Sequence, residues 1–363
     1  MNIKSLNRKL NKKFAGRVTA RLSDGCIVLT GELDDWNDVV DAGMTAATPH
    51  SSTHVVNDIV FTAAPEEKMH VPALSDKALE GDRPDVLVIG GGISGCSVAR
   101  ELARYKLNVL LIEKEADLAL GASGRNDGEV HPGVDLSKGS LKHKYIRRAN
   151  HMYEDLCREL DVPFKRTGQY ACFTHKSWLP FVSLYAKWRR DHDGIEDTCI
   201  VMGDEIRKKE PKISADVAFA LSNPSSGSVS PYNLVIAYAE NAVQNGARVS
   251  LNTAVTGMDV SGGEIKAVYT NRGTIYPREV INCAGVYSDV VAQMAQDRFF
   301  SIHPRRGTNS ILDKKTGASF HGIASIVMSQ SPVQTHTKGG GILHTVHDNL
   351  LAGPDAVETY ERE

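Results

Sequence analysis

The spacing of apolar and polar residues predicts a small α+β unit at the start of the chain. A lysine-rich stretch over residues 4–14 predicts a helix, and residues 18–22 then alternate as in a half-buried strand. A second apolar run covers residues 26–31, and the pair Asp24-Gly25 between the runs supplies the positive φ angles of a tight turn. We therefore expect a β-hairpin at this point.

Two further elements complete this unit. Residues 34–47 predict a helix that Asp34 or Asp35 caps, because their apolar residues recur with helical spacing. Residues 55–61 predict a third strand. The next segment, residues 63–84, is rich in proline, alanine and charge, and we expect a linker there.

From Asp85 onward strands and helices alternate, which is typical of an α/β domain with a parallel sheet. Residues 234–245 predict a helix, and a strand and a hairpin with a two-glycine turn follow it. Residues 280–285 predict a buried strand that enters a turn of small residues. Residues 165–230 mix short strands with one helix, and we expect them to form a substrate-side insertion.

The charge balance changes this picture only near the N-terminus. The net charge of the 363 residues is −2, which argues against nucleic acid as a partner. The basic residues of the N-terminal cluster are Lys4, Arg8, Lys9, Lys12, Lys13 and Arg17. Such a cluster is either the solvated face of a helix or a contact with an anionic lipid surface or an acidic partner.

The six cysteines are scattered and include no Cys-x-x-Cys pair. This argues against a zinc site, an iron–sulfur cluster or a disulfide framework, so we expect no metal site and a reducing cytoplasm. The basic N-terminus is not followed by the apolar core of a secretory signal, and no apolar run approaches the length needed to cross a membrane.

A glycine-rich segment, Gly90-Gly-Gly92-Ile-Ser-Gly95, lies between a strand of four apolar residues and a helix. In this context Gly-x-Gly-x-x-Gly binds a dinucleotide: the first glycine makes the turn, the second lets the backbone approach the pyrophosphate, and the third allows close helix packing. The helix N-terminus offers N–H groups to the phosphates. Glu113 ends the second strand, where an acid accepts hydrogen bonds from a ribose diol. These features suit FAD and NAD equally.

Motifs downstream resemble those of the FAD-dependent oxidoreductases of the D-amino-acid oxidase superfamily, in the branch of glycerol-3-phosphate and L-2-hydroxyglutarate dehydrogenases. They occur in order from about residue 84 to the C-terminus. The segments that carry the resemblance are Gly121–Gly133, Gly139–Lys142, Leu160–Gly168, Asn282–Asp289, Pro304–Gly307 and Leu351–Pro354. The resemblance implies FAD as the cofactor.

The resemblance also implies positions for the residues that hold FAD. Gly90, Gly92, Ile93, Ser94 and Gly95 would hold the pyrophosphate. The residues expected elsewhere around the cofactor are Glu113 and Lys114 at the adenosine ribose, Ser123, Asn126 and Gly128 toward the flavin, Val255 at the adenine, and Ala284 and Gly285 near the pyrophosphate.

Two residues are candidates for catalysis. His131 occupies the position at which the family places a residue over the flavin ring, and a neutral imidazole there can take the hydroxyl proton of a substrate. Its alternative role is only to hydrogen-bond the flavin loop. Arg306 would pair with a substrate carboxylate or phosphate, with Arg305 as a competitor and a surface arginine as the alternative. His336, Lys338 and His344 are weaker candidates.

The predicted fold class is α/β: a Rossmann-like FAD-binding domain, an interleaved substrate domain with a mixed or antiparallel sheet, and a small α+β N-terminal domain. The expected boundaries are 1–62 for the N-terminal domain, 63–84 for the linker, 85–164 and 231–297 for the FAD-binding domain, and 165–230 and 298–363 for the substrate domain.

The N-terminal unit resembles the BON domain, which is thought to bind membranes or partner proteins. The resemblance rests on the Gly25–Gly31 core and on residues 55–59. In the oxidoreductase family the chain continues well past Gly353-Pro354, which implies a C-terminal truncation here and an incomplete wall around the flavin.

The function that the resemblance implies is hydride transfer to FAD from a small anionic 2-hydroxy compound. Glycerol 3-phosphate is the first substrate expected, and L-2-hydroxyglutarate or a similar acid the next. The alternatives are an amine or amino-acid oxidase of the same superfamily and a truncated, non-catalytic protein that binds nucleotide or partners. The electron acceptor would be quinone, a protein or oxygen, and the protein would be cytoplasmic or peripheral to the inner membrane face.

Overall fold

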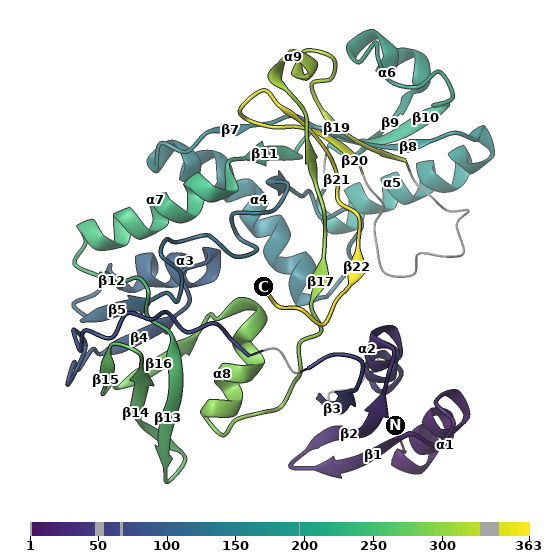
Figure 1. Cartoon of the computed structure of the whole chain (residues 1–363). Coiled ribbons are helices and arrows are strands. Elements are labelled where there is room, and N and C mark those ends of the chain that lie inside the picture. Colours follow the sequence, from purple (N-terminus) through teal and green to yellow (C-terminus); the bar gives the residue numbers. More distant parts are fainter. Residues whose placement is uncertain (1, 48–53, 66–67, 196, 327–340) are drawn as a thin grey trace. The chain divides into compact units, whose positions relative to one another are not determined.

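The computed structural model describes residues 2–47, 54–65, 68–195, 197–326 and 341–363 (Figure 1). The chain forms two compact units. Unit 1 comprises Met1–Ala122, Tyr238–Arg306 and Val357–Glu363, and unit 2 comprises Ser123–Ala237 and Gly307–Ala356. One helix, α7 (Pro231–Gln244), contributes residues to both units.

Unit 1 begins with a module of three strands and two helices. Its elements are α1 (Ile3–Lys13), β1 (Val18–Ser23), β2 (Cys26–Leu33), α2 (Trp36–Ala46) and β3 (Val55–Phe61). The central strand β2 pairs antiparallel with β1 and parallel with β3. Asp24 and Gly25 have φ angles of 49° and 77°, so the expected tight hairpin turn is confirmed.

The N-terminal module, residues 2–62, packs against later segments of unit 1. The side-chain amide of Asn57 approaches His303 Nε2 at 2.9 Å, and its backbone N–H donates to Ser301 Oγ at 2.9 Å. Burial lowers the pKa of His303, and a neutral ring can accept such a hydrogen bond. The Trp36 ring lies 5.8 Å from the His303 ring and 6.3 Å from the Tyr360 ring.

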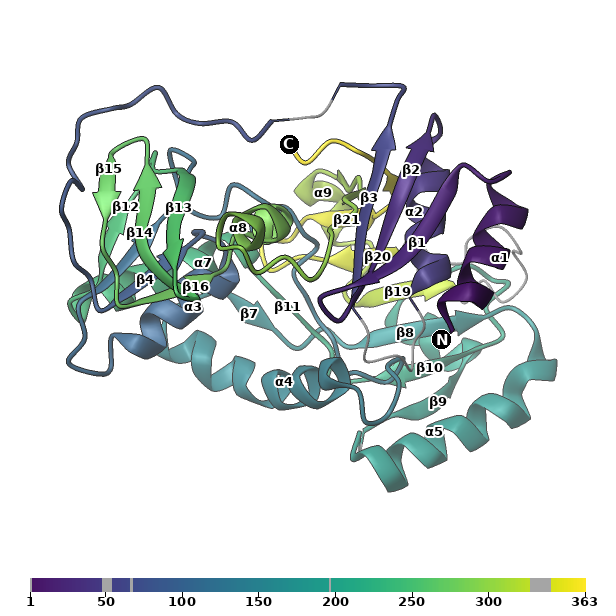
Figure 2. The same cartoon turned by 90° about the horizontal axis from the view of Figure 1, so that it is seen from below.

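A parallel sheet with the order β12-β5-β4-β16 forms the second part of unit 1 (Figures 1 and 2). Its elements are β4 (Val86–Ile89), α3 (Ile93–Leu102), β5 (Val109–Ile112), β12 (Arg248–Ser250) and β16 (Glu279–Asn282). Strands β4 and β5 are buried along their whole length. The strand expected at residues 280–285 is present as β16 and is followed by a turn, but its expected burial is wrong, because β16 is an edge strand whose ends are exposed.

An antiparallel meander shares its core with this sheet. It consists of β13 (Val255–Ser261), β14 (Glu264–Thr270) and β15 (Gly273–Ile275), followed by η2 (Gly285–Tyr287) and α8 (Ser288–Met294). Residues 63–84 connect the N-terminal module to this region. Arg272 binds Asp76 at 2.7 Å and Arg248 binds Asp82 at 2.6 Å, so the second half of the connection is held against the meander and the sheet. The short pair β17 (Arg305–Arg306) and β22 (Val357–Glu358) completes unit 1.

In the described part of unit 2, a mixed sheet has the order β18-β21-β20-β19-β8-β10-β9, and a smaller one has the order β6-β11-β7. The strands are β6 (Glu129–Val130), β7 (Phe164–Lys165), β8 (Gln169–Phe173), β9 (Cys199–Met202), β10 (Phe219–Asn223), β11 (Gly227–Val229), β18 (Ser310–Ile311), β19 (Ile323–Ile326), β20 (Gly341–His344) and β21 (Leu350–Gly353). The helices are α4 (Leu141–Glu159), η1 (Lys176–Trp178), α5 (Leu179–Asp193), α6 (Gly203–Lys209) and α9 (Lys314–Gly317). The predicted α/β class is confirmed.

Helix α5 carries a buried ion pair on the face that it turns to the core. Arg189 and Asp193, with side chains 4% and 0% exposed, approach to 2.6 Å. The same guanidinium donates to the Tyr185 hydroxyl at 2.9 Å and to the Leu136 carbonyl. The ion pair therefore anchors the loop around Leu136 to the helix. No helix among the described residues is long and apolar enough to span a membrane.

Candidate functional site

Gly90 and Gly95 occupy positions in the β4–α3 loop that no larger residue could occupy unchanged. Gly90 has a φ of +109°, and a Cβ atom there would lie 2.3 Å from the Cys283 carbonyl oxygen. A Cβ atom on Gly95 would lie 1.9 Å from the Gly90 carbonyl oxygen. Gly92 is the N-cap of α3, and Ile93 and Ser94 open the helix. The first turn of a helix points N–H groups outward, so this loop forms a cradle that suits a pyrophosphate.

Glu113 follows β5 and holds the glycine loop through its carboxylate. Its Oε2 accepts a hydrogen bond from the Gly91 N–H at 2.5 Å, and its Oε1 accepts one from the Glu115 N–H at 2.9 Å. A carboxylate oxygen has lone-pair capacity for more than one donor. The position next to the loop therefore fits an acid that also accepts hydrogen bonds from a ribose diol.

The turn after β16 runs beside Gly90. The Asn282 side chain holds this turn: its Oδ1 accepts from the Ala284 N–H at 3.2 Å, and its Nδ2 donates to the Ser288 carbonyl at 2.8 Å. Gly285 has a φ of +57°, a conformation that favours glycine. The cradle and this turn thus lie together, as a site for one dinucleotide requires.

Lys114 and Val255 lie in different surroundings within unit 1. Lys114 Nζ binds the carboxylates of Glu115 and Glu363, the latter at 2.6 Å. Burial alone would lower the pKa of Lys114, but these two hydrogen bonds outweigh it and raise the pKa above its usual value. Val255 is buried at the start of β13, opposite Thr270 on β14.

The segment from Ser123 to Gly128 belongs to unit 2 and folds on itself. The Asn126 side chain donates to the Ser123 carbonyl at 2.8 Å and accepts from the Gly128 N–H at 2.9 Å. Gly128 has a φ of +72°, and a Cβ atom there would lie 2.3 Å from the Val229 carbonyl oxygen. Local hydrogen bonds and one glycine therefore fix this loop immediately before β6.

His131 lies directly after β6, and its Nδ1 is 3.2 Å from Glu129 Oε1. The Asn150 side chain donates to the His131 carbonyl at 3.0 Å. Glu129 is a residue that the sequence reasoning missed. The available signal was its spacing of two residues from His131, which puts both side chains on one face of an extended segment.

Arg305 and Arg306 differ in their contacts. Arg305 Nε lies 3.2 Å from Glu358 Oε1, across the β17–β22 pair. Arg306 is exposed and forms no ion pair with the residues that the structure describes. Of the two, Arg306 is therefore the guanidinium available to an anion. His131 belongs to unit 2 and Arg306 to unit 1.

Of the three weaker candidates for catalysis, the structure describes one, His344. His344 is 8% exposed, and burial lowers its pKa. His336 and Lys338 lie outside the described residues.

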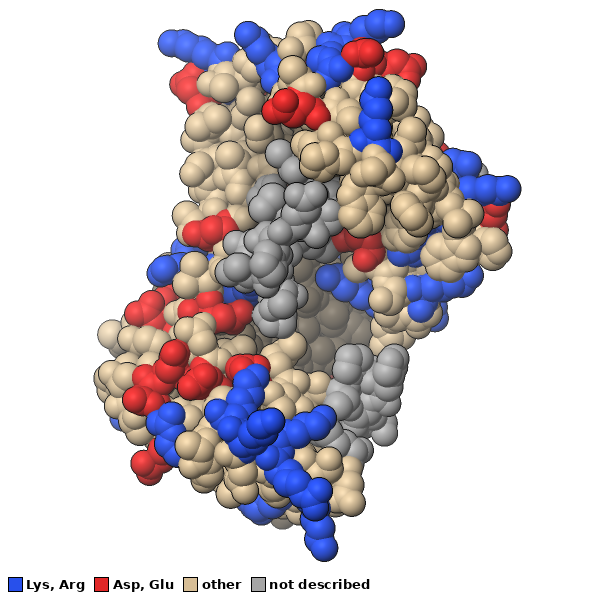
Figure 3. Space-filling model, turned by 90° about the vertical axis from the view of Figure 1, so that its right-hand side faces the viewer, with Lys and Arg blue, Asp and Glu red and all other residues tan. Residues whose placement is uncertain are grey.

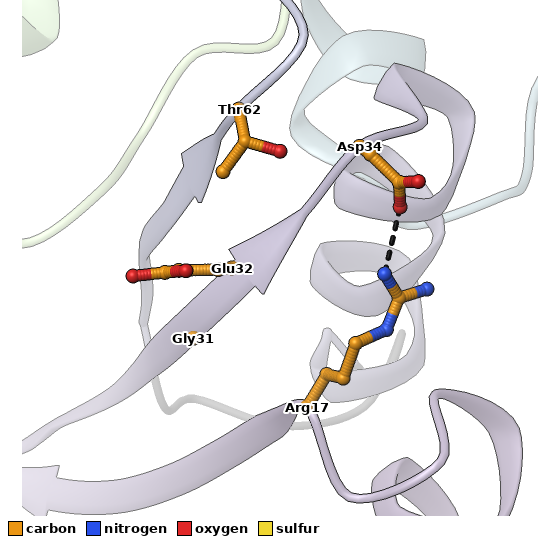
Figure 4. A pocket seen from close by; sticks show the side chains of 5 residues that line it. All are labelled: Arg17, Gly31, Glu32, Asp34 and Thr62. Carbon is orange, nitrogen blue, oxygen red and sulfur yellow. Dashed lines mark hydrogen bonds and ion pairs between the residues drawn. The ribbon is translucent and has the colours of Figure 1, made fainter.

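A hollow of about 630 Å³ in the N-terminal module is lined by Arg17, Gly31, Glu32, Asp34 and Thr62 (Figure 4). None of the predicted site residues lines this hollow, and Arg17 is paired with Asp34 at 2.7 Å.

Asp289, at the end of the Asn282–Asp289 motif, is held by several donors. Arg362 contacts both carboxylate oxygens at 2.7 and 3.0 Å, and the backbone N–H groups of Val290 and Ile302 donate at 3.0 and 2.9 Å. Burial alone would raise the pKa of Asp289, but these hydrogen bonds lower it below its ordinary value of 3.8.

The Asp289→Asn variant should therefore be less stable at neutral pH, by about 2 kcal/mol, as expected for a charge-assisted network. Because the folded pKa is depressed, this stability is present above the unfolded pKa and is lost as the pH falls through the folded pKa. Urea unfolding of both proteins at pH 7 and at lower pH would measure it. A difference that does not shrink in acid would contradict this assignment.

Comparisons with known proteins agree with this geometry. The family model "DAO: FAD dependent oxidoreductase" matches residues 85–363. A glycerol 3-phosphate dehydrogenase of Caloramator mitchellensis is 36% identical over 279 residues, which cover 77% of this chain and 56% of that protein. An L-2-hydroxyglutarate dehydrogenase of Indibacter alkaliphilus is 30% identical over 283 residues, which cover 77% of this chain and 69% of that protein. The chain thus spans little more than half the length of the first of these relatives.

The fold is also found among solved structures. The structure of L-α-glycerophosphate oxidase from Mycoplasma pneumoniae, reduced with dithionite and with FAD bound, superposes with a TM-score of 0.68 at 24% identity. The match covers 77% of this chain and 73% of that one. The glycine cradle, the acid after β5 and the family match together identify the chain: it belongs to the family of FAD-dependent oxidoreductases.

Proposed function

We propose that the protein oxidises a small anionic 2-hydroxy compound with FAD, with glycerol 3-phosphate as the first candidate and L-2-hydroxyglutarate or a similar acid as the next. The observation that carries the proposal is the His131–Glu129 pair directly after the Ser123–Gly128 loop, because an imidazole held by a carboxylate is suited to take up a hydroxyl proton. The relatives named for these two substrates support the substrate class.

Several residues would hold the cofactor in this proposal. The Gly90–Gly95 cradle and the N-terminus of α3 would bind the pyrophosphate, and Glu113 would bind the adenosine ribose. Ala284 and Gly285 would pass beside the pyrophosphate, Val255 would meet the adenine and Lys114 would lie near the ribose. Ser123, Asn126 and Gly128 would face the flavin.

The protein's own residues supply the acid–base and anion-binding parts of the reaction. Oxidation of the carbinol to a ketone removes two electrons and two protons, and bound FAD would supply the acceptor for the two electrons and the carbon-bound hydrogen. The hydroxyl proton would go to His131, whose Nδ1 lies 3.2 Å from Glu129 Oε1. Arg306 would pair with the carboxylate or phosphate of the substrate.

Anaerobic reduction of the bound flavin tests the proposal. The purified protein should show a flavin spectrum that bleaches with glycerol 3-phosphate or L-2-hydroxyglutarate. The His131→Asn variant should retain flavin and bleach about 100-fold more slowly, the usual contribution of a general base. Bleaching by amines or amino acids instead would favour an oxidase of that class. A protein without flavin, and without stabilisation by added FAD, would favour a non-catalytic binding role.

The N-terminal module has a separate role in this proposal. Lysines and arginines gather at the lower end of the face shown in Figure 3, over the N-terminal module. Lys4, Arg8, Lys9 and Lys12 are exposed on α1 and form no ion pair with the described residues. We propose that this basic surface of a BON-like module contacts an anionic lipid surface or an acidic partner. In this proposal the protein is cytoplasmic, and its electron acceptor is a quinone, a protein or oxygen.

A further inference from the structure

The Glu129 carboxylate is held in one orientation by its surroundings. Its side chain is 9% exposed, and two hydrogen-bond donors and the His131 ring converge on the Oε1 atom. His131 Nδ1 lies at 3.2 Å, Gln169 Nε2 at 2.9 Å and Ser226 Oγ at 3.4 Å. Several contacts on one carboxylate oxygen fix the orientation of the group. All four residues lie in unit 2.

A buried polar chain continues behind Glu129. Gln169 on β8 accepts a hydrogen bond from the Asn223 side chain at 3.4 Å, and Asn223 on β10 accepts one from the Thr198 hydroxyl at 2.8 Å. Asn223 and Thr198 are fully buried, and Asn223 is the register partner of Gln169 across the two strands. The sheet itself therefore fixes the amide that orients the Glu129 carboxylate.

The basic side chains on and beside β7 are engaged with partners other than Glu129. On β7, Lys165 binds Asp348 at 2.8 Å, and the adjacent Arg166 donates to Asn150 from two of its nitrogens. Asp127 accepts a hydrogen bond from the Glu129 backbone N–H at 3.1 Å. The contacts of the Glu129 side chain thus run to His131 and to neutral donors, and its negative charge acts on the imidazole.

We propose that Glu129 is the positioning residue of the reaction, holding His131 in the tautomer that carries its proton on Nδ1. The inference rests on the proposed function, in which His131 takes the substrate proton. With the proton fixed on Nδ1, Nε2 is the basic nitrogen of the neutral ring. When the hydroxyl proton arrives on Nε2, the ring becomes an imidazolium whose Nδ1–H donates to the Glu129 carboxylate. Glu129 itself gains no proton, and the proton stays on His131 until it passes to water.

The test combines spectroscopy with kinetics, using full-length protein with nitrogen- and carbon-labelled histidine. His131→Gln identifies the His131 signals. In the wild-type protein, nitrogen chemical shifts should show His131 with its proton on Nδ1. In Glu129→Gln, which keeps the size but removes the charge, the pKa of His131 should fall by about one unit, as expected on loss of a neighbouring carboxylate. The Glu205→Gln variant, at an exposed acid on α6, should leave both readouts unchanged.

The kinetic measurements distinguish a role of Glu129 in positioning His131 from a role in the stability of the fold alone. In Glu129→Gln, kcat should fall about 10- to 100-fold, KM should change little, and the acidic limb of the kcat/KM profile should move to lower pH. A wild-type His131 with its proton on Nε2, or an unshifted His131 pKa in Glu129→Gln, would overturn the inference even if that variant lost activity. If no substrate candidate reduces the wild-type flavin, the proposed function fails, while the spectra still decide the Glu129–His131 pairing.

Discussion

Replacing Gly95 with alanine should abolish FAD binding and destabilise unit 1 by about 3 kcal/mol, near the upper end for overpacking. The added Cβ atom would lie 1.9 Å from the Gly90 carbonyl oxygen, and this oxygen belongs to the backbone of the turn. A flexible side chain could move aside, but here either α3 must shift away from β4 or the turn must open. Both movements displace the N–H groups that would bind the pyrophosphate.

Thermal unfolding with and without added FAD measures both effects in the Gly95→Ala variant. The wild-type midpoint should rise with FAD, because the ligand binds the folded state, whereas the midpoint of the variant should be lower and should not respond. Gly121→Ala is the matched control: the same change is made at a glycine where the added Cβ atom would meet nothing within 4 Å. An FAD response that survives in Gly95→Ala would show that the cradle is not the pyrophosphate site.

Replacing Asp193 with alanine should destabilise unit 2 by about 3–5 kcal/mol, the range expected when one partner of a buried ion pair is removed. Arg189 would keep its charge at a position that is 4% exposed, with the Tyr185 hydroxyl and the Leu136 carbonyl as its remaining acceptors. Lys138, 3.5 Å from Asp193 in the wild-type structure, would also lose its ion-pair partner. The loop that follows His131 should therefore loosen together with the core.

Denaturant unfolding of Asp193→Ala should be compared with that of Asp191→Ala, which removes an exposed carboxylate two residues earlier on the same helix. The control should change stability by less than about 0.5 kcal/mol. A double variant, Arg189→Met with Asp193→Leu, should recover most of the loss because it leaves no buried charge unpaired. Equal losses in the Asp191 and Asp193 variants would contradict the account.

Features specified by local sequence could be predicted. Asp24-Gly25 dictates a two-residue turn, and the glycine spacing of residues 90–95 dictates a turn followed by a helix start. Both depend on backbone conformations that few residue types adopt. The α/β class followed from alternating strands and helices. The choice of FAD over NAD came from resemblance, because both cofactors share the ADP moiety that the loop would hold.

Features that depend on contacts between distant segments were missed. The 280–285 strand is as apolar as a buried one, but strand order decides burial, and β16 lies at the edge of its sheet. Asp289 was recognised as part of a motif, but its partner Arg362 is 73 residues away. The spacing of two residues from His131 could have indicated Glu129. No local pattern could have indicated Gln169, which is 40 residues further on.

The fluorescence of the three tryptophans reports on two different parts of the molecule. Trp36 lies in the N-terminal module, packed on Phe61, His303 and Tyr360, and its indole nitrogen is buried without a hydrogen-bond partner among the described residues. Trp178 and Trp188 lie at η1 and α5 in unit 2 and are 40% and 38% exposed. Trp36 emission therefore reports the docking of the module on residues 298–306 and 357–363. With Trp178 and Trp188 replaced by phenylalanine, tryptophan fluorescence follows detachment of the module independently of the flavin absorbance.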